Sequence, residues 1–268
     1  MNKSLLNKSL ETSPGLTIDD LNKYLPAIHT IEDITMTTEK MQEGLFLANC
    51  LEGLQKIPDQ SIDLIIADPP ENPAERIETN NNPMTLNEYF LWNTKWIKEA
   101  KRILKNTGSI YIFTKWEFSS MYHGLLNNHF RIRSRIIWRD YVKRENPRIP
   151  TWINETADIW FATKTDDFLF YQKAVSVEAD RQELINNSTL SNLWLDIPDS
   201  LDQNENKPEE LFTRIIQASS FKLNWILDPF MSTGDSGISA KKCGRRFIGF
   251  ETNKDNLLLA MKRIDQKD

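Results

Sequence analysis

The chain has little of what disulfide-bonded, metal-binding or membrane proteins need. Its 268 residues include two cysteines, Cys50 and Cys243, which are too few for the disulfide framework of a small secreted domain. The three histidines, His29, His123 and His129, are scattered, so no metal-ligand spacing is present. No apolar run approaches the roughly 20 residues that span a bilayer, and the N-terminus lacks the features of a signal peptide. We therefore expect a reduced, metal-free cytoplasmic protein, of a bacterial or phage-like intracellular kind.

An excess of positive charge is also missing overall, although one segment has it. The net charge of −5 argues against a protein that binds nucleic acid through its whole surface. The segment from residue 131 to residue 148, however, contains seven basic residues and only two acidic ones, with Trp138 and Tyr141 interleaved. This segment is either a solvated strand-and-turn face with core tryptophans or a surface for an anion such as DNA. The density of cations favours the second interpretation.

From residue 44 onward, short apolar runs typical of strands alternate with segments of helical period. The predicted strands are 45–48, 62–67, 109–113, 135–138, 158–163, 225–228 and 247–251. One predicted helix, 86–105, has a single apolar face and ends at Lys105-Asn106-Thr107-Gly108. Another, 208–220, begins with a proline and two acids, as the positive end of a helix prefers. The alternation predicts the α/β class, with a mostly parallel seven-stranded sheet and helices on both faces.

Two segments lack the pattern of a sheet domain. Residues 1–40 are polar, with one amphipathic stretch at 18–28, and are predicted to form an N-terminal arm. Residues 171–206 are polar and acidic with weak periodicity, so we expect a loop or a small excursion from the sheet.

Two of the predicted strands end in residues that suggest chemistry, because ligands bind beyond the carboxyl ends of the strands in open α/β sheets. One strand runs into Asp68-Pro69-Pro70. The other opens residues 226–251, a strand, a turn with Gly234, a helix and a second strand that ends at Glu251. This carboxylate could accept two hydrogen bonds from a ribose diol. Each half alone could be an ordinary strand exit or turn, but their joint presence favours a nucleoside-cofactor site.

Five segments in this order resemble a known family. They are 48–70, 89–113, 136–164, 207–220 and 226–253. Their order and spacing resemble the beta-order, amino-directed (N6-adenine or N4-cytosine) DNA methyltransferases that use S-adenosyl-L-methionine. The resemblance implies a Rossmann-like methyltransferase domain at 41–268, with the DNA-facing, target-recognition segment at about 116–206. It also implies duplex or single-stranded DNA as partner, and it allows a homodimer or pairing with another methyltransferase subunit.

The same resemblance assigns roles to individual residues. Asp68 and the Pro69 carbonyl would each accept a hydrogen of the target amine, which aims the nitrogen lone pair at the methyl group, and Pro70 would stiffen this segment. The catalytic set is Asp68, Pro69, Pro70 and Glu71. The cofactor set is Asn49, Asp68, Lys207, Asp228, Phe230, Ser232, Gly234 and Glu251. The DNA-binding set is Arg135, Arg139, Lys143, Arg144, Arg148 and Trp152.

The chain departs from the family pattern at several of these positions. Glu71 stands where the family has an aromatic ring that stacks on the target base, unless Trp116 or Trp152 supplies that ring. Asn49 replaces an acid, Ser232 replaces a glycine, and residues 203–206 replace His-Pro-Thr-Gln. Three functions follow: methylation of adenine N6 in DNA, which Asp-Pro-Pro favours by association; a catalytically attenuated or silent homologue that binds DNA or a partner subunit; and a methyltransferase of other substrates.

Overall fold

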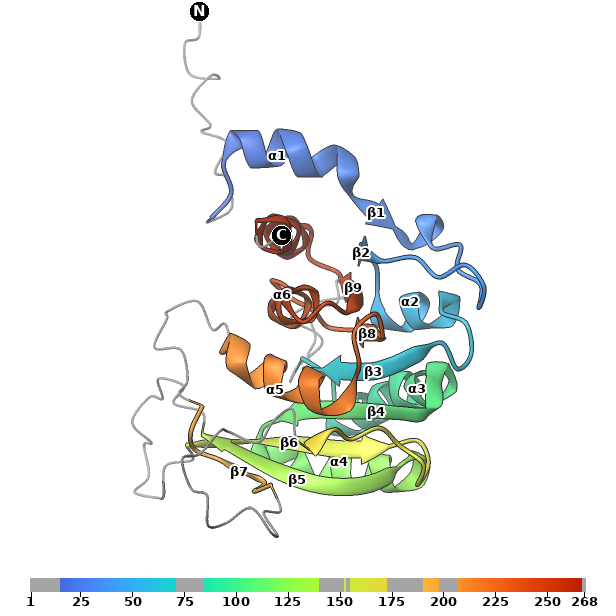
Figure 1. Cartoon of the computed structure of the whole chain (residues 1–268), viewed down its shortest axis with the longest axis vertical. Coiled ribbons are helices and arrows are strands. Elements are labelled where there is room, and N and C mark those ends of the chain that lie inside the picture. The colour runs from blue at the N-terminus through green and yellow to red at the C-terminus, as the bar shows by residue number, and fades with distance from the viewer. Residues whose placement is uncertain are drawn as a thin grey trace, which may run out of the picture.

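The computed structural model describes residues 15–70, 84–139, 152, 155–172, 190–197 and 207–266. Within them, nine strands form one sheet in the order β1-β2-β9-β8-β3-β4-β6-β5-β7 (Figure 1). The strands are β1 (His29–Thr30), β2 (Gly44–Leu47), β3 (Ile62–Ala67), β4 (Leu104–Thr114), β5 (Arg131–Arg139), β6 (Thr156–Thr163), β7 (Leu193–Trp194), β8 (Trp225–Asp228) and β9 (Arg246–Glu251). Neighbouring strands are parallel, except that β6 is antiparallel to β4 and β5. The prediction of an α/β protein with a mostly parallel sheet is confirmed.

All seven predicted strands are present, and the bounds of β3 and β8 agree with the prediction. The two additional strands, β1 and β7, lie at the edges of the sheet. Each has two residues, which is too short for a periodic pattern of apolar side chains to appear in the sequence.

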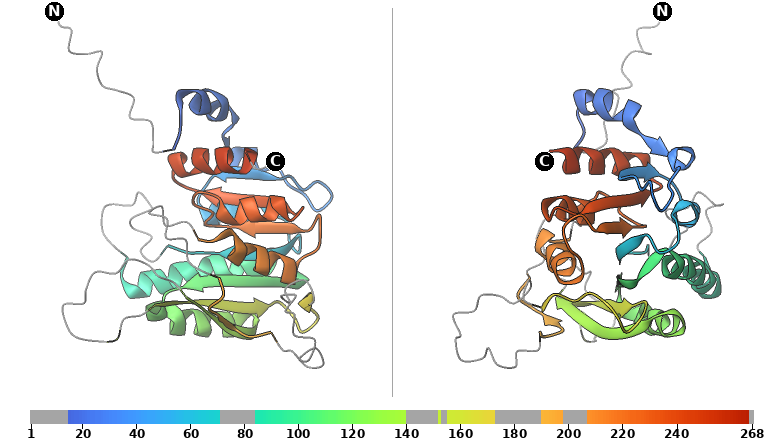
Figure 2. Two further views of the ribbon diagram at one scale, coloured as in Figure 1. Left: turned by 60° about the vertical axis from the view of Figure 1, so that its left-hand side comes forward. Right: turned by 45° about the vertical axis from the view of Figure 1, so that its right-hand side comes forward.

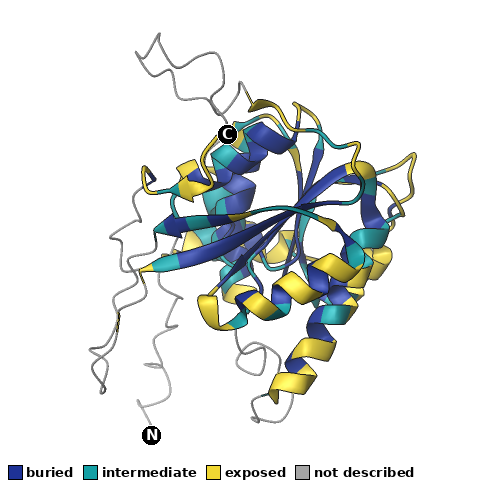
Figure 3. Cartoon of the chain, turned by 90° about the horizontal axis from the view of Figure 1, so that it is seen from below, coloured by how far each residue is buried: buried dark blue, intermediate teal, exposed yellow. Residues whose placement is uncertain are grey.

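Helices cover both faces of the sheet, as predicted (Figures 1 and 2). They are α1 (Ile18–Tyr24), α2 (Cys50–Lys56), α3 (Leu86–Ile103), α4 (Trp116–His129), α5 (Glu209–Ser219), α6 (Asp235–Lys242) and α7 (Lys254–Asp265). In β3, Ile65 belongs to the core that packs on α2, α3 and α4. Its neighbours Leu64 and Ile66 belong to the core that packs on α5, α6 and α7. The alternation of side chains along a strand thus gives β3 two buried faces, and Figure 3 shows the buried sheet between helices with exposed outer faces.

Helix α3 begins where its sequence indicates but ends earlier than predicted. Its first turn has a capping box, in which the Thr85 hydroxyl accepts from the Glu88 amide and the Glu88 carboxylate accepts from Thr85. The predicted end at Lys105-Asn106-Thr107-Gly108 is wrong, because these residues already belong to β4. A Cβ atom on Gly108 would lie 3.0 Å from the Asp63 carbonyl oxygen. This glycine therefore permits close packing of β3 on β4 rather than a helix cap.

The described part of the predicted N-terminal arm packs on the rest of the chain. Tyr24 of α1 is buried with Leu258 of α7, and its hydroxyl donates to Asp265 at 2.8 Å. Ile34 and Met36 are part of the core on the α2 side of the sheet. Figure 2 shows α1 lying beside α7. The division of the chain into an arm and a domain at residue 41 stays a prediction.

Within the described segments, we find no helix with the length and apolar content required to traverse a lipid bilayer.

Candidate active site at the carboxyl ends of the strands

Four polar residues of the predicted site lie at or just beyond the carboxyl ends of four adjacent strands. Asp228 is the last residue of β8 and Glu251 the last of β9, while Asp68 comes directly after β3 and Asn49 two residues after β2. The strands β2, β9, β8 and β3 are neighbours and parallel, so their carboxyl ends lie at one edge of the sheet. The fold therefore brings the two halves of the predicted site to the same edge.

A narrow cavity at this edge is lined from both halves of the predicted site. Asn49, Phe230 and Glu251 of the predicted cofactor set line it together with Pro70 of the catalytic segment. Trp92 of α3, which the sequence analysis did not single out, forms another part of its wall. The Phe230 ring packs against Trp92 with 5.6 Å between ring centroids. The periodic apolar face of α3 was the available signal for Trp92, but it does not distinguish a cavity wall from core.

Asn49 and Glu251 are held in place by the chain next to them. Asn49 is the N-cap of α2, and its side-chain oxygen accepts from the Leu51 amide at 2.9 Å. Glu251 is buried, and its Oε1 accepts from the Asn253 amide at 2.7 Å. Among the described residues, Oε2 of Glu251 accepts no hydrogen bond. This oxygen is a free acceptor for a polar ligand in the cavity.

The turn between β8 and α6 depends on two residues with positive φ angles. Ser232 has a φ of 49° and Gly234 a φ of 88°. A Cβ atom on Gly234 would also lie 3.0 Å from the Cβ of Ala260 in α7. Gly234 is thus required both by its backbone conformation and by the close approach of α7, whereas Ser232 adopts its conformation with a side chain present.

Asp68 forms an ion pair with Lys207, which lies two residues before α5. The Lys207 ammonium bonds Oδ2 of Asp68 and lies 5.5 Å from the centre of the Phe113 ring. Among the described residues, Oδ1 of Asp68 has no hydrogen-bond partner, and the Asp68 side chain is 43% exposed. The structure thus brings Asp68 and Lys207 together and leaves one carboxylate oxygen open to a ligand.

The predicted DNA-binding residues are only partly described. Arg135 pairs with the buried Asp158 at 2.9 Å, and Arg139 lies 3.7 Å from Glu155. Trp152 is 94% exposed. Glu71, Lys143, Arg144 and Arg148 lie outside the described residues.

The comparison with known proteins assigns the chain to a family. The family model for DNA methylases of the N6 and N4 type matches residues 62–262. The chain belongs to the DNA methylase family. The predicted resemblance is thereby confirmed, and the strand-end residues described above lie in or near the matched region.

Similar proteins span most of this methylase. It is 29% identical over 240 residues to the type II methyltransferase M.HpaI of Haemophilus parainfluenzae, covering 85% of this chain and 76% of that protein. It is 29% identical over 238 residues to the DNA adenine methyltransferase YhdJ of Escherichia coli strain K12, covering 81% of each. The structure of TTHA0409 from Thermus thermophilus, complexed with S-adenosyl-L-methionine, matches with a TM-score of 0.64 and 20% identity, over 84% of this chain and 94% of that one. This last match shows a common fold.

S-adenosyl-L-methionine is the cofactor of the methylase, and the donor set at the strand ends fits it. The open oxygen of Glu251 suits a ribose diol, and the Asn49 amide suits a purine edge. Phe230 and Trp92 offer apolar surface for the remainder of the ligand. The roles of the individual residues remain predictions.

The pKa of Asp228 of the methylase differs from that of an ordinary carboxyl group. Complete burial raises its pKa to about 7, and the nearby charges of Asp68 and Glu251 act in the same direction. The Ser236 hydroxyl at 2.5 Å and the Phe230 amide at 2.9 Å donate to its two oxygens and oppose the rise. Asp228 thus carries a proton in part of the molecules at neutral pH.

The free energy of unfolding of the wild type is expected to fall as the pH rises from 4 to 8, and replacing Asp228 by asparagine should make this fall smaller. Above a pH of about 4 the unfolded chain gives up this proton, while the folded wild type keeps it until about pH 7, so rising pH destabilises the fold. The upper bound of this loss is about 4 kcal/mol. Asparagine can accept from Phe230 and donate to Ser236 without titrating.

Chemical unfolding of the two proteins at several pH values measures this effect. The exposed Asp167 of the loop after β6 provides a control, because Asp167→Asn should keep the wild-type pH dependence. Parallel curves for wild type and Asp228→Asn would contradict the expectation.

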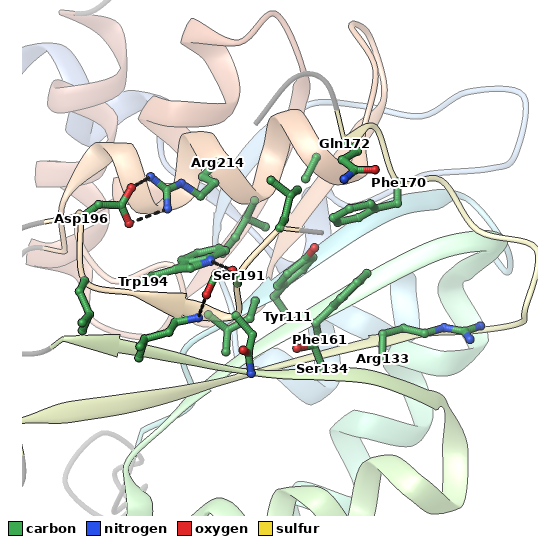
Figure 4. A pocket seen from close by; sticks show the side chains of 17 residues that line it. Tyr111, Arg133, Ser134, Phe161, Phe170, Gln172, Ser191, Trp194, Asp196 and Arg214 are labelled. Carbon is green, nitrogen blue, oxygen red and sulfur yellow. Dashed lines mark hydrogen bonds and ion pairs between the residues drawn. The ribbon is translucent and has the colours of Figure 1, made fainter. Parts of the chain in front are cut away.

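The methylase has a second, larger cavity of about 670 Å³ that contains none of the predicted site residues. Tyr111 and Phe161 of the sheet, Trp194 of β7 and Arg214 of α5 point toward it (Figure 4). Its Arg214 is already paired with Asp196 at 2.6 Å. The sequence analysis missed this cavity, because its walls come from segments that are far apart in the chain.

Proposed function

We propose that this methylase transfers the methyl group of S-adenosyl-L-methionine to the exocyclic N6 amine of adenine in specific DNA sites. The observation that carries the proposal is the convergence of Asp68-Pro69-Pro70 with the cofactor set around Glu251 and Phe230 at one edge of the sheet. The name of the relative YhdJ supports adenine as the target base. The comparisons do not favour a homologue that binds DNA without methylating it, and Glu71, on which that alternative depends, lies outside the described residues.

The proposed mechanism depends on hydrogen-bond acceptors at the end of β3. The amine of adenine is a poor nucleophile, because its lone pair is delocalised into the ring. Oδ1 of Asp68 and the Pro69 carbonyl would each accept one amine hydrogen and direct the nitrogen lone pair toward the methyl donor. Lys207 would hold Oδ2 of Asp68 and keep the carboxylate oriented. When bound, S-adenosyl-L-methionine supplies an electrophilic methyl group on a positively charged sulfur.

Transfer of a labelled methyl group tests the proposed function. The protein is incubated with labelled S-adenosyl-L-methionine and with single- or double-stranded DNA of mixed sequence, and the DNA is then digested to nucleosides. We expect the label in N6-methyladenine. Label in N4-methylcytosine would change the assigned base, and DNA without label would overturn the proposal.

We also propose that the chain from Arg135 in the middle of β5 onward, through Trp152, contacts DNA. Its candidate residues are Arg135, Arg139, Lys143, Arg144, Arg148 and Trp152. The exposed indole of Trp152 is available for stacking, and the Arg139 guanidinium lies 3.7 Å from the Glu155 carboxylate. Arg135 is paired with the buried Asp158 at 2.9 Å, so it contributes a charge with a fixed position.

Replacing Arg139 and Arg144 together by glutamine is expected to weaken DNA binding and its salt dependence. If each cation neutralises one phosphate, the slope of log K against log salt falls by about 2 for duplex DNA. Fluorescence anisotropy with labelled DNA at several salt concentrations measures the slope. Arg131 lies at the opposite end of β5, so Arg131→Gln is the control that should keep the wild-type slope. An unchanged slope in the double variant would remove these residues from the interface.

Two further predictions concern the place of action and the pairing of subunits. We propose an intracellular place of action, because the substrate DNA is found there. Pairing with a second copy or with another methyltransferase subunit stays a prediction.

A further inference from the structure

A buried hydrogen-bond network lies behind the segment that carries Asp68. The Tyr89 hydroxyl of α3 donates to the Pro70 carbonyl at 2.9 Å, and it is 3.1 Å from the Tyr122 hydroxyl of α4. The Tyr122 hydroxyl and the Trp96 indole N–H both donate to the side-chain oxygen of Asn93, each at 2.8 Å. The methyl-transfer mechanism described above uses none of these groups.

This network supplies a hydrogen-bond donor to a segment in which two prolines lack backbone N–H groups. Neither Pro69 nor Pro70 has a backbone N–H, so these two residues can be anchored by backbone hydrogen bonds only through their carbonyl groups. Among the described residues, Tyr89 is the one donor to the Pro70 carbonyl. The Pro69 carbonyl belongs to the planar peptide unit that precedes Pro70, and the Pro70 ring fixes the φ angle between that unit and the next. Only the ψ angle of Pro70 then separates the two carbonyl groups, so fixing the Pro70 carbonyl limits the orientation of the Pro69 carbonyl, which is an acceptor in the proposed mechanism.

The Tyr89 hydroxyl is itself held in one position. The Asn93 amide is oriented, because its oxygen accepts from Trp96, whose indole can only donate, and its nitrogen donates to the Tyr89 carbonyl at 2.9 Å. The Tyr89 ring stacks on Trp92 and meets Phe118 edge-on, with 6.0 and 5.2 Å between ring centroids. Tyr89 is 4% exposed. Thus the donor to Pro70 has little freedom to move.

The same face of α3 also holds the cofactor turn. Trp96 meets the Phe230 ring edge-on at 5.3 Å, two turns along the helix from Tyr89. One rigid helix therefore contacts both the catalytic segment, through Pro70, and the turn after β8, through Phe230. This arrangement fixes the position of Pro70 relative to Phe230 of the turn after β8.

We propose that Tyr89 is a positioning residue for methyl transfer, whose hydroxyl holds the Asp68-Pro69-Pro70 segment in its catalytic orientation through the Pro70 carbonyl. The inference rests on the proposed function, because it assigns a role within that site. Loss of the hydroxyl should slow the transfer step and leave binding of S-adenosyl-L-methionine nearly unchanged.

The test compares Tyr89→Phe with Tyr111→Phe. Tyr111 is also buried, and its hydroxyl bonds Ser219 at 2.8 Å on the other face of the sheet, so its loss has a similar structural cost. We expect kcat of Tyr89→Phe to fall about tenfold. The dissociation constant of S-adenosyl-L-methionine should change less than about twofold, and Tyr111→Phe should keep the wild-type kcat. A Tyr89→Phe variant with the kcat of Tyr111→Phe would overturn the inference, as would a kcat loss that disappears at lower temperature in step with regained folding.

A second readout does not require activity. In protein labelled with ¹³C at the proline carbonyl carbons, the Pro70 resonance should shift in Tyr89→Phe and stay in place in Tyr111→Phe. If Tyr89→Phe does not fold, Tyr122→Phe removes the hydroxyl next to Tyr89 and should shift the same resonance. An unmoved Pro70 resonance in the folded variant contradicts the inference. If the resonance shifts in Tyr89→Phe but the wild type methylates no DNA, only the proposed function is contradicted.

Discussion

Replacement of Asp68 by asparagine is expected to lower the rate of methyl transfer to DNA by about 10²–10³-fold, the usual effect of removing one preorganised polar group from a reacting centre. The amide that replaces the carboxylate has one oxygen rather than two. Its nitrogen is a hydrogen-bond donor and cannot accept a hydrogen from the amine of the base. Oδ1 of Asp68, which has no hydrogen-bond partner among the described residues, is the atom that this change affects, since Oδ2 is occupied by Lys207.

Binding and transfer must be measured separately for this variant. Calorimetry with S-adenosyl-L-methionine should show a loss of affinity much smaller than the loss of rate, because Asp68 is one member of the predicted cofactor set and Glu251, Phe230 and Asn49 are unchanged. Asp59→Asn is the matched control, because Asp59 also pairs with a cation, Arg102, but lies before β3 at the opposite edge of the sheet. Full activity of Asp68→Asn would remove this carboxylate from the mechanism.

Replacement of Glu71 by tyrosine is expected to raise methyl-transfer efficiency by about 5–150-fold, which corresponds to the roughly 1–3 kcal/mol of stacking one aromatic ring gives a base. In this family an aromatic residue follows Asp-Pro-Pro, and a carboxylate cannot stack on a flipped base. The gain should appear mainly as a lower KM for DNA, because stacking stabilises the captured base both before and during the transfer.

A second variant separates the effect of the Glu71 charge from the effect of the missing aromatic ring. Glu71→Gln removes the negative charge three positions after Asp68 in the sequence but supplies no ring, so it should recover less activity than Glu71→Tyr. Equal activity of the two variants would show that charge alone limits the wild type. No gain in either would indicate that another ring already stacks on the base, and Trp116 is a candidate, since it is 53% exposed at the start of α4, directly after the carboxyl end of β4.

The departures of Asn49 and Ser232 from the family pattern are compatible with the described geometry. Asn49 caps α2 through its side-chain oxygen and still lines the cofactor cavity with its remaining atoms. Ser232 adopts a positive φ angle in the turn after β8. Ser232 does not line the cavity and Asn49 can still offer its amide to a ligand there, so Glu71 is the departure with the greatest expected effect on activity.

Helix α3 illustrates where prediction from sequence succeeded and where it failed. The period of its apolar residues indicated a helix with one buried face, and the buried residues of that face include Trp96, Ile97 and Ala100. The predicted end was wrong, because Gly108 was interpreted as a helix terminator although it serves the pairing of β3 with β4. A local signal for glycine does not reveal which neighbouring segment requires the absence of a side chain.

The sequence by itself determined the alternation of strands and helices, the bounds of β3 and β8, and the polar residues at the strand ends. These features depend on the order of apolar and polar residues within a few positions, and that order is local. Only the tertiary structure decided which distant groups meet: Lys207 with Asp68 across 139 positions, and Tyr89 with Pro70 across 19. Such contacts result from the packing of helices on a completed sheet, and no periodicity along the chain encodes them.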